Sequence, residues 1–225
     1  MLFDNDVFRL QSDGGWRFNI IMLDVALNTL PNGLLGILQA RLDDLPDQAR
    51  QVMQIAAISG QQFWESNLVT LTDMDNISSW IQHLITHGMV VEDDRSIFDG
   101  EHQYHFKHNL YRDVAYKMIP RVKRQDYHRQ TALWLLERIA GATNSYPLLA
   151  EQFADSGNYL AALYTYLEAI EVQILKKQEL KALKFIDKAL SLANQVDRNE
   201  ALAVVAKLWA YRGEALITLE RYEEA

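Results

Sequence analysis

Histidines are the residues of this chain whose types and spacing come nearest to a metal site. His102, His105 and His108 follow one another at every third position, and His83 and His87 lie four residues apart. In an extended strand His102 and His105 point to opposite faces, and the chain has no Cys that could complete a zinc site. His83 and His87 fit the solvated C-terminal end of a helix, where positive charge is favoured. We therefore expect no metal site.

The motifs of phosphate binding and nucleophilic catalysis are also missing from the sequence. The sequence contains no G-x-x-x-x-G-K motif followed by Ser or Thr, so no loop whose backbone would cradle phosphates is expected. Ser59 and Ser78 lie outside any G-x-S-x-G elbow, and no carboxylate stands in an apolar pattern typical of a general acid. We expect no catalytic residue and no enzyme activity within these 225 residues.

Composition favours a helical globular protein. Hydrophobic residues make up 49% of the chain, with only 4 Pro and 10 Gly. The net charge of −8 provides no global attraction to nucleic acid or to anionic lipid. No apolar run reaches the roughly 20 residues of a membrane span, and the absence of Cys suits a reducing compartment. We expect a cytoplasmic protein without a membrane segment.

The first half of the chain combines a hairpin pattern with three helices and a ribbon. Apolar and polar residues alternate over 7–10 and 16–20, on either side of turn residues, which predicts a hairpin. Helical spacing follows from Pro31 to Leu45 and again from Asp47 to Ile58. The next elements expected are a short helix over about 63–71, a third helix over 75–88 and two strands at 89–91 and 104–106. Three helices followed by a two-stranded ribbon is the order of a winged helix.

The second half of the chain is predicted to contain only helices. The expected segments are about 109–118, 120–139, 147–156, 159–176, 180–195 and 199–219, with a linker at 141–145. Small residues recur in this half, since Ala150 and Ala162 are twelve positions apart, as are Gly213 and Ala225. This spacing is typical of tetratricopeptide repeats, whose paired helices meet at small residues. A generic α-helical bundle is the alternative.

Aromatic residues of these repeats would provide the faces that bind a protein partner. Phe153, Tyr159, Tyr166 and Trp209 stand at the repeat's spaced positions, and we expect a partner to bind there. The chain ends within the pattern Trp209, Gly213, Leu216, Tyr222 and Ala225, which predicts the first helix of a further repeat. We therefore expect a fragment of a longer protein, whose Trp209, Leu216 and Tyr222 form an exposed apolar patch prone to self-association.

A winged helix can bind DNA, so charge on its third helix decides between two functions. The segment 75–88 contains no Lys or Arg, whereas a DNA-reading helix needs cations to meet phosphates and guanines. Its stripe of apolar residues predicts that Trp80 packs in the core. A basic run occurs later, at Arg121, Lys123, Arg124, His128 and Arg129, and favours a docking face or a solvated helix face. A DNA-binding transcriptional regulator with a repeat-based sensor or dimerisation region remains the alternative.

Three stretches resemble a known family. Residues 34–46, 53–63 and 106–119 read LLGILQARLDDLP, MQIAAISGQQF and FKHNLYRDVAYKMI. They are similar to the region after the ATPase module of STAND proteins, the signal-transduction ATPases with numerous domains. The resemblance covers roughly residues 30–225. It implies a mainly α chain in which 1–45 is a remnant of the ATPase lid, 46–140 a winged helix with following helices, and 146–225 a set of tetratricopeptide-like repeats.

The same resemblance implies a nucleotide sensor outside any catalytic centre. His108 matches the His of the MHD-type motif, in which a winged-helix His contacts the phosphate of ADP and locks the resting state. Asn109 and Lys107 replace the other two residues of that motif. His108 alternatively only caps or packs at a strand-to-helix corner. Arg112 is expected to stay near His108 as a second cation or to brace an acidic neighbour. ATP or ADP would bind the missing ATPase core of the full-length protein, and this region would regulate and scaffold.

Overall fold

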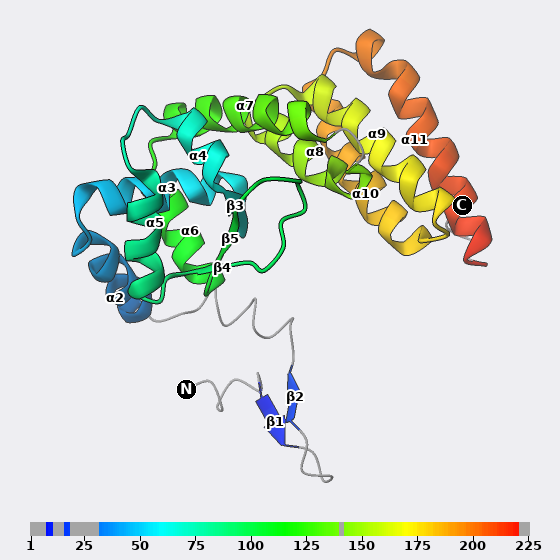
Figure 1. The fold of residues 1–225 in the computed structure, drawn as a ribbon. Coiled ribbons are helices and arrows are strands. Elements are labelled where there is room, and N and C mark those ends of the chain that lie inside the picture. The colour runs from blue at the N-terminus through cyan, green and yellow to red at the C-terminus, as the bar shows by residue number, and fades with distance from the viewer. Residues whose placement is uncertain (1–7, 11–15, 19–31, 140–141, 221–225) are drawn as a thin grey trace. The chain divides into compact units, whose positions relative to one another are not determined.

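The computed structural model describes residues 8–10, 16–18, 32–139 and 142–220, which are mainly helical (Figure 1). The chain divides into two compact units, Met1–Pro46 and Asp47–Ala225. In the first unit β1 (Phe8–Leu10) pairs antiparallel with β2 (Trp16–Phe18), and α2 spans Asn32–Asp43. The pairing confirms the hairpin that the alternating pattern predicts.

The second unit begins with three helices and a three-stranded sheet. Its elements are, in order, α3 (Asp47–Ser59), β3 (Gln62–Trp64), α4 (Glu65–Leu71), α5 (Ile77–Thr86), β4 (Val90–Glu92) and β5 (Gln103–Phe106). β5 lies in the middle of the sheet and pairs antiparallel with both β3 and β4. Gly60, with φ of 114°, follows α3 in a conformation that residues with a Cβ rarely adopt.

Strand β3 corrects the sequence prediction, which assigned Phe63 to the start of a helix. Phe63 pairs with Tyr104 of β5, and its ring stacks on Tyr104 with 5.6 Å between centroids and lies 5.4 Å from Phe106. Aromatic residues pack well on a pleated surface, so this contact with β5 outweighs the local helical pattern. The helix α4 therefore begins only at Glu65.

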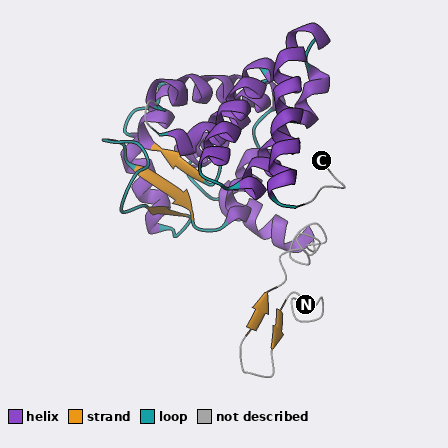
Figure 2. Cartoon of the chain, turned by 90° about the vertical axis from the view of Figure 1, so that its right-hand side faces the viewer, coloured by secondary structure: helices purple, strands orange, loops and turns teal. Residues whose placement is uncertain are grey.

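The remaining elements are helices. They are α6 (Asn109–Lys117), α7 (Arg121–Arg138), the 3-10 turn η1 (Thr143–Ser145), α8 (Tyr146–Asp155), α9 (Tyr159–Leu175), α10 (Glu179–Leu192), the 3-10 turn η2 (Ala193–Gln195) and α11 (Arg198–Thr218). Consecutive helices from α7 to α11 pack on one another, and α11 also packs on α9. Figure 2 turns the α11 end of this array toward the viewer.

Small residues allow these helices to approach closely. Ala150 of α8, Ala162 and Ala169 of α9, and Ala182 and Ala189 of α10 are all fully buried. Of the positions that the sequence spacing singled out, Ala150 and Ala162 therefore lie in the core of the helical array, whereas Gly213 is only partly buried and Ala225 lies outside the described residues. Between α8 and α9 the chain turns at Gly157, with φ of 86°, and the side chain of Asn158 caps α9 by accepting a hydrogen bond from the backbone N–H of Ala161.

Candidate functional site

The loop between β4 and β5, residues 93–102, is fixed to α7 by an aromatic cluster. Phe98, at the tip of this loop, is 3% exposed, and its ring centroid lies 5.1 Å from that of Trp64 and 5.6 Å from that of Trp134. Trp64 and Trp134 stack on each other at 5.4 Å. The loop therefore contributes to the core between β3 and α7 and does not extend freely from the sheet.

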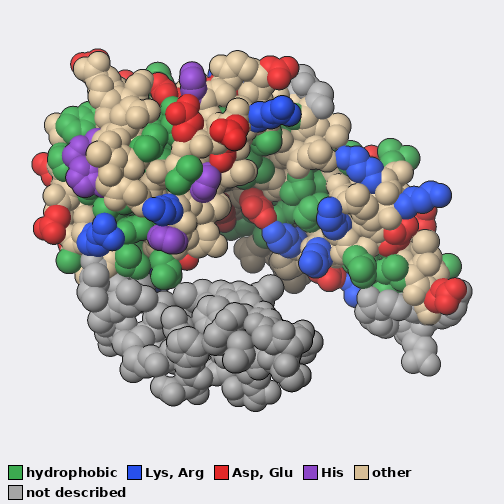
Figure 3. Space-filling model, turned by 60° about the horizontal axis from the view of Figure 1, so that its bottom comes forward, with side chains coloured by type: hydrophobic (Ala, Val, Ile, Leu, Met, Phe, Trp, Pro, Cys, Tyr) green, Lys and Arg blue, Asp and Glu red, His purple; other side chains and the backbone are tan. Residues whose placement is uncertain are grey.

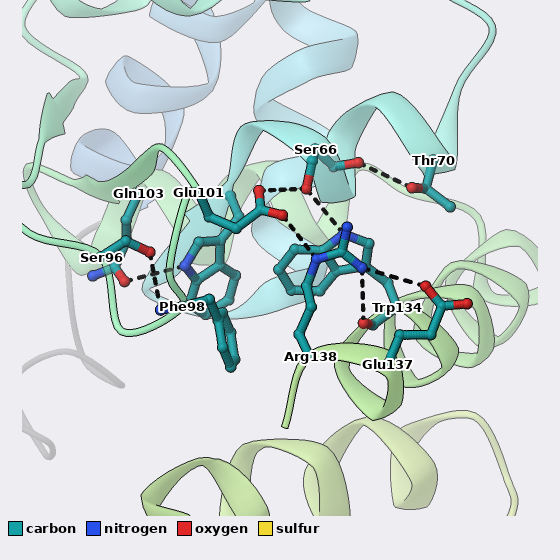
Figure 4. A network of polar contacts seen from close by, with 10 residues as sticks. Ser66, Thr70, Ser96, Phe98, Glu101, Gln103, Trp134, Glu137 and Arg138 are labelled. Carbon is teal, nitrogen blue, oxygen red and sulfur yellow. Dashed lines mark hydrogen bonds and ion pairs between the residues drawn. The ribbon is translucent and has the colours of Figure 1, made fainter. Parts of the chain in front are cut away.

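Polar contacts fix the C-terminal side of the same loop (Figure 4). The carboxylate of Glu101 accepts a hydrogen bond of 2.8 Å from Nε of Arg138 and a second bond from the hydroxyl of Ser66. That hydroxyl accepts a bond of 3.0 Å from the indole N–H of Trp134. The guanidinium of Arg138 lies over the Trp134 ring, 4.4 Å from its centroid. One carboxylate thus joins the loop to α4 and to α7.

A buried amide fixes the other side of the loop. Oε1 of Gln103 accepts hydrogen bonds from the indole N–H of Trp64 at 3.1 Å and from the backbone N–H of Ile97 at 3.0 Å. Its Nε2 donates to Oδ2 of Asp93 at 2.7 Å, and Oδ1 of Asp93 lies 2.6 Å from Nδ1 of His105. Since both sides of the loop are bonded to buried groups, this loop is part of the rigid frame.

The helix α5 carries no Lys or Arg. Its sequence, ISSWIQHLIT, holds no Lys or Arg, and only Ile77, Ile81 and Leu84 are buried. Trp80, which the apolar stripe assigned to the core, is only partly buried, and its ring lies 6.2 Å from that of His83. On the face shown in Figure 3, described Lys and Arg side chains are interspersed with Asp and Glu. This helix therefore lacks the charges that would meet a phosphate backbone.

His108 lies on the surface at the N-terminus of α6. It is the N-cap residue of that helix, its side chain makes no capping hydrogen bond, and its ring is exposed, 6.1 Å from the ring of Tyr111. The positive end of the helix dipole and an imidazole are thus presented together to solvent. This arrangement suits an anion such as a phosphate or a carboxylate.

Arg112 is partly buried and braces α6 against α3. Its Nε donates a 3.1 Å hydrogen bond to the carbonyl oxygen of Ala57, in the last turn of α3, where a cation also meets the negative end of the helix dipole. Its Nη1 lies 3.2 Å from Asp113, and its guanidinium lies 4.8 Å from the centroid of the Tyr116 ring. The structure therefore gives Arg112 a bracing position between α6 and α3 and pairs it with an acidic neighbour.

A chain of directed hydrogen bonds runs from α6 to α3 through α7 and α8. Gln152 donates through Nε2 to the carbonyl oxygen of Ile58 at 3.1 Å, so its Oε1 faces Nδ1 of His128 at 2.8 Å and accepts a hydrogen bond from the N–H group there. Nε2 of the neutral imidazole then accepts from the hydroxyl of Tyr116 at 2.9 Å. We call Tyr116, His128, Gln152 and Ile58 the relay. It satisfies every polar group of a His that is 1% exposed.

Burial favours the neutral form of His128. Burial is the main cause that lowers the pKa of His128 below its usual value, and the nearby guanidiniums of Arg112 and Arg124 lower it further. The hydrogen bond to Gln152 and the charge of Asp155, whose Oδ2 lies 3.9 Å from Nε2, oppose this change. His128 therefore acts as a buried hydrogen-bond donor and acceptor. This corrects the sequence analysis, which counted His128 among the residues of a basic run on a docking or solvated face.

Other members of that run also have structural contacts. Arg124 donates to the carbonyl oxygens of Ile119 at 2.7 Å and Lys117 at 2.9 Å, so it caps the end of α6, and its guanidinium lies 4.7 Å from the centroid of the Tyr116 ring. Arg129 donates to Asp126 at 2.6 Å. The run is thus not a row of free cations, and the C-terminal end of α6 is held by one of its members.

A cavity of about 540 Å³ lies beside the relay, between the end of α3, the sheet, α6 and α8. Its lining includes Ser59, Asp93, His105, Arg112 and Asp155. Of the two residues of the expected sensor, Arg112 lines this cavity and His108 does not. Arg112 and Gln152, which line the cavity, both bond to the last carbonyls of α3. This cavity therefore marks the joint between the sheet-containing half and the helical array.

The aromatic residues expected to bind a partner have different environments. Tyr166 is 2% exposed and belongs to the core of α9, α10 and α11, so no partner can reach it, which corrects the prediction. Phe153 is partly buried and packs against the cluster of Trp64 and Trp134, and Tyr159 is partly buried. Trp209 is exposed on α11.

The expected apolar patch at the end of the chain is also only partly right. Leu216 is buried in the core formed by α9, α10 and α11, so it does not contribute to a surface patch. Its position on α11 points toward α9 and α10, which already cover that face. Tyr222 lies outside the residues that the structure describes.

Comparison with known protein families, with curated proteins and with solved structures finds no match. Within the described part of the chain, no three His, Cys, Asp or Glu side chains are grouped so that they could hold a metal ion. No helix among the described residues combines the length and the apolar character needed to cross a membrane. The site must therefore be interpreted from its own geometry.

Proposed function

We propose that this region is a winged helix followed by tetratricopeptide-like repeats, and that it regulates a STAND-type signal-transduction ATPase without catalysing a reaction itself. The element order α3–β3–α4–α5–β4–β5 and the central place of β5 in the sheet support the winged helix. Antiparallel helices that meet at buried Ala residues support the repeats.

The fixed β4–β5 loop is the observation that favours regulation over DNA binding. A winged helix that reads DNA uses a helix with cations and a wing that is free to reach the duplex. Here the loop that would form the wing is held by Phe98 and Glu101, and the helix that would read bases has no Lys or Arg. These contacts couple the position of the β4–β5 loop to that of α7 within the same protein.

In this proposal His108 is the contact with nucleotide. Its exposed imidazole at the N-terminus of α6 would bind a phosphate of ADP that an ATPase core of the same protein holds in the resting state. Arg112 would fix the position of α6 against α3, and so the position of His108. ATP or ADP is thus a ligand of the ATPase core, and this region would sense which nucleotide is bound.

The relay would carry that state to the repeats. Tyr116 lies on α6, the same helix that begins at His108, and Gln152 lies on α8, the first helix of the repeats. A movement of α6 would have to break or carry along the bonds from Tyr116 to His128 and from His128 to Gln152. A protein partner of the repeats would respond to that movement, in the cytoplasm where such ATPases act.

The release of ADP tests this function in a protein that joins this region to an ATPase core. His108→Ala should speed the release of a fluorescent ADP analogue about tenfold to a hundredfold, because a charged hydrogen bond is worth roughly 1.5–3 kcal/mol. The matched control is His102→Ala, which removes an exposed His that lies 3.2 Å from Glu92 and should leave release unchanged. If His108→Ala and His102→Ala release ADP at the wild-type rate, the sensor role is wrong.

A further inference from the structure

The outer face of α11 carries an apolar stripe that stays largely exposed, although the guanidinium of Arg212 lies 5.7 Å from the centroid of the Trp209 ring. Leu202, Trp209 and Ile217 are 63%, 57% and 54% exposed, although α11 buries Leu208 and Leu216 on its other side. The small residues Ala206, Ala210 and Gly213 lie between the three large ones. At 100° per residue all six fall within an arc of about 100°. We call these six residues the α11 stripe.

Gly213 indicates what kind of group the stripe fits. Glycine inside a helix costs about 1 kcal/mol relative to alanine, so its presence calls for a reason. A Cβ at Gly213 would meet no atom within 4 Å, so no described residue requires the glycine. Small residues on a helix face allow the backbone of another helix to approach closely. The stripe is thus shaped for a helix.

Large and small side chains follow one another along the α11 stripe in an order that fits a second, antiparallel copy of the same stripe. Leu202 stands seven residues before Trp209, and Ile217 stands seven residues after Ala210. Ala206 stands three before Trp209, and Gly213 three after Ala210. In an antiparallel pair of α11 helices, Leu202 of one copy would therefore meet Ile217 of the other. Trp209 would meet Ala210 at the centre, so a large side chain lies opposite a small one.

Charges beside the stripe fit the same arrangement. Lys207 and Glu214 are exposed, and helix geometry puts both on one flank of the stripe, roughly 100° from its centre. When two copies are antiparallel about a two-fold axis through the centre, the same flanks face each other. Lys207 of each copy then lies within one turn of Glu214 of the other, so two ion pairs can form.

We propose that the α11 stripe is a self-association surface, on which a second copy of this chain packs its own α11 in antiparallel orientation. One helix from each copy gives an interface at the small end of the range for specific complexes, so the dimer is a weak one. The proposal does not depend on the nucleotide-sensing function, because no residue of the sensor or of the relay takes part in it.

Sedimentation of the 225-residue chain over the micromolar range tests the surface. The wild-type mass should rise toward that of a dimer with concentration, and Trp209→Glu should weaken association at least tenfold while the helical circular dichroism stays unchanged. The control is Leu175→Glu, at an 85% exposed position at the end of α9 and outside the stripe, which should dimerise like the wild type. A chain that stays monomeric at every concentration, or a dimer that tolerates Trp209→Glu, would overturn the proposal.

A charge swap tests the orientation. Lys207→Glu should weaken the dimer, because the new carboxylate faces Glu214 of the second copy, and Lys207→Glu combined with Glu214→Lys should restore it. If the double variant stays as weak as the single one, the antiparallel register is wrong. A monomer whose Trp209 fluorescence is shielded from quenchers would show instead that a segment of the same chain after Leu219 covers the stripe, and would also overturn the proposal.

Discussion

Glu101 and Arg138 are 37 residues apart in the sequence, yet Nε of Arg138 donates a 2.8 Å hydrogen bond to the Glu101 carboxylate. Both side chains are mostly buried, so water screens this ion pair less than an exposed one. Through this contact a loop of the sheet depends on the last turn of α7. The position of the loop and the position of the helical array are therefore linked by one ion pair and by the aromatic rings below it.

Removing the carboxylate should release the loop. Glu101→Ala leaves Arg138 without its charged acceptor on the loop. We therefore expect the free energy needed to open the loop to fall by about 1.5–3 kcal/mol. Trypsin should then cut after the exposed Arg95 about tenfold to a hundredfold faster, since cleavage follows the population of the open loop. The rate of this cut at several protease concentrations is the measurement.

Glu137 provides the control for this experiment. It also accepts a bond from Arg138, at 3.4 Å, but its side chain is exposed, and exposed ion pairs contribute little. Glu137→Ala should therefore leave cleavage after Arg95 near the wild-type rate. Equal rates for the Glu101 and Glu137 variants would show that the ion pair does not hold the loop.

Phe98 should contribute more stability than any other side chain of the loop. Phe98→Ala opens a cavity beside the stacked rings of Trp64 and Trp134, and a buried Phe→Ala change costs about 3–5 kcal/mol. Urea denaturation should show this loss in the free energy of unfolding, together with a weaker near-ultraviolet signal from the stacked indoles. Ile97→Ala, at the exposed neighbouring position, should cost no more than about 0.5 kcal/mol. Similar costs at the two positions would contradict the packing of the loop.

Helical periodicity predicted most of the fold, because it reports on burial within one element. The stripes of α3 and α5, the hairpin at the N-terminus and the buried Ala positions of α8 to α10 all follow from residues a few positions apart. β3 was missed because it is only three residues long and depends on pairing with β5, about 40 residues later. Aromatic residues such as Phe63 suit a short helix or a strand equally well at that length.

The candidate site was less predictable, because its contacts join distant parts of the sequence. The exposed place of His108 could be expected from its position before α6, whereas the bond from Arg112 to Ala57 spans 55 residues. His128 was grouped with cations by its neighbours in sequence. Its spacing from Ala132 and Leu135, both buried on α7, was the available signal that it faces the core.

The relay should make stability depend on pH. In the unfolded chain His128 has its ordinary pKa of about 6.5, while burial lowers the pKa in the folded state. Between these two values the unfolded state binds more protons, so the free energy of unfolding rises with pH and falls as the solution becomes more acidic than about pH 6.5. A proton on Nε2 would also leave the hydroxyl of Tyr116 facing a donor in place of an acceptor.

His128→Gln provides the decisive comparison, because Gln keeps hydrogen-bonding capacity and cannot take up a proton in this range. Urea unfolding at pH 7.5 and at pH 5.5 should show a larger acid loss for the wild type than for His128→Gln, by at most about 1.4 kcal/mol for each pH unit below 6.5. If His128→Gln loses as much stability in acid as the wild type does, another group titrates and the neutral relay is wrong.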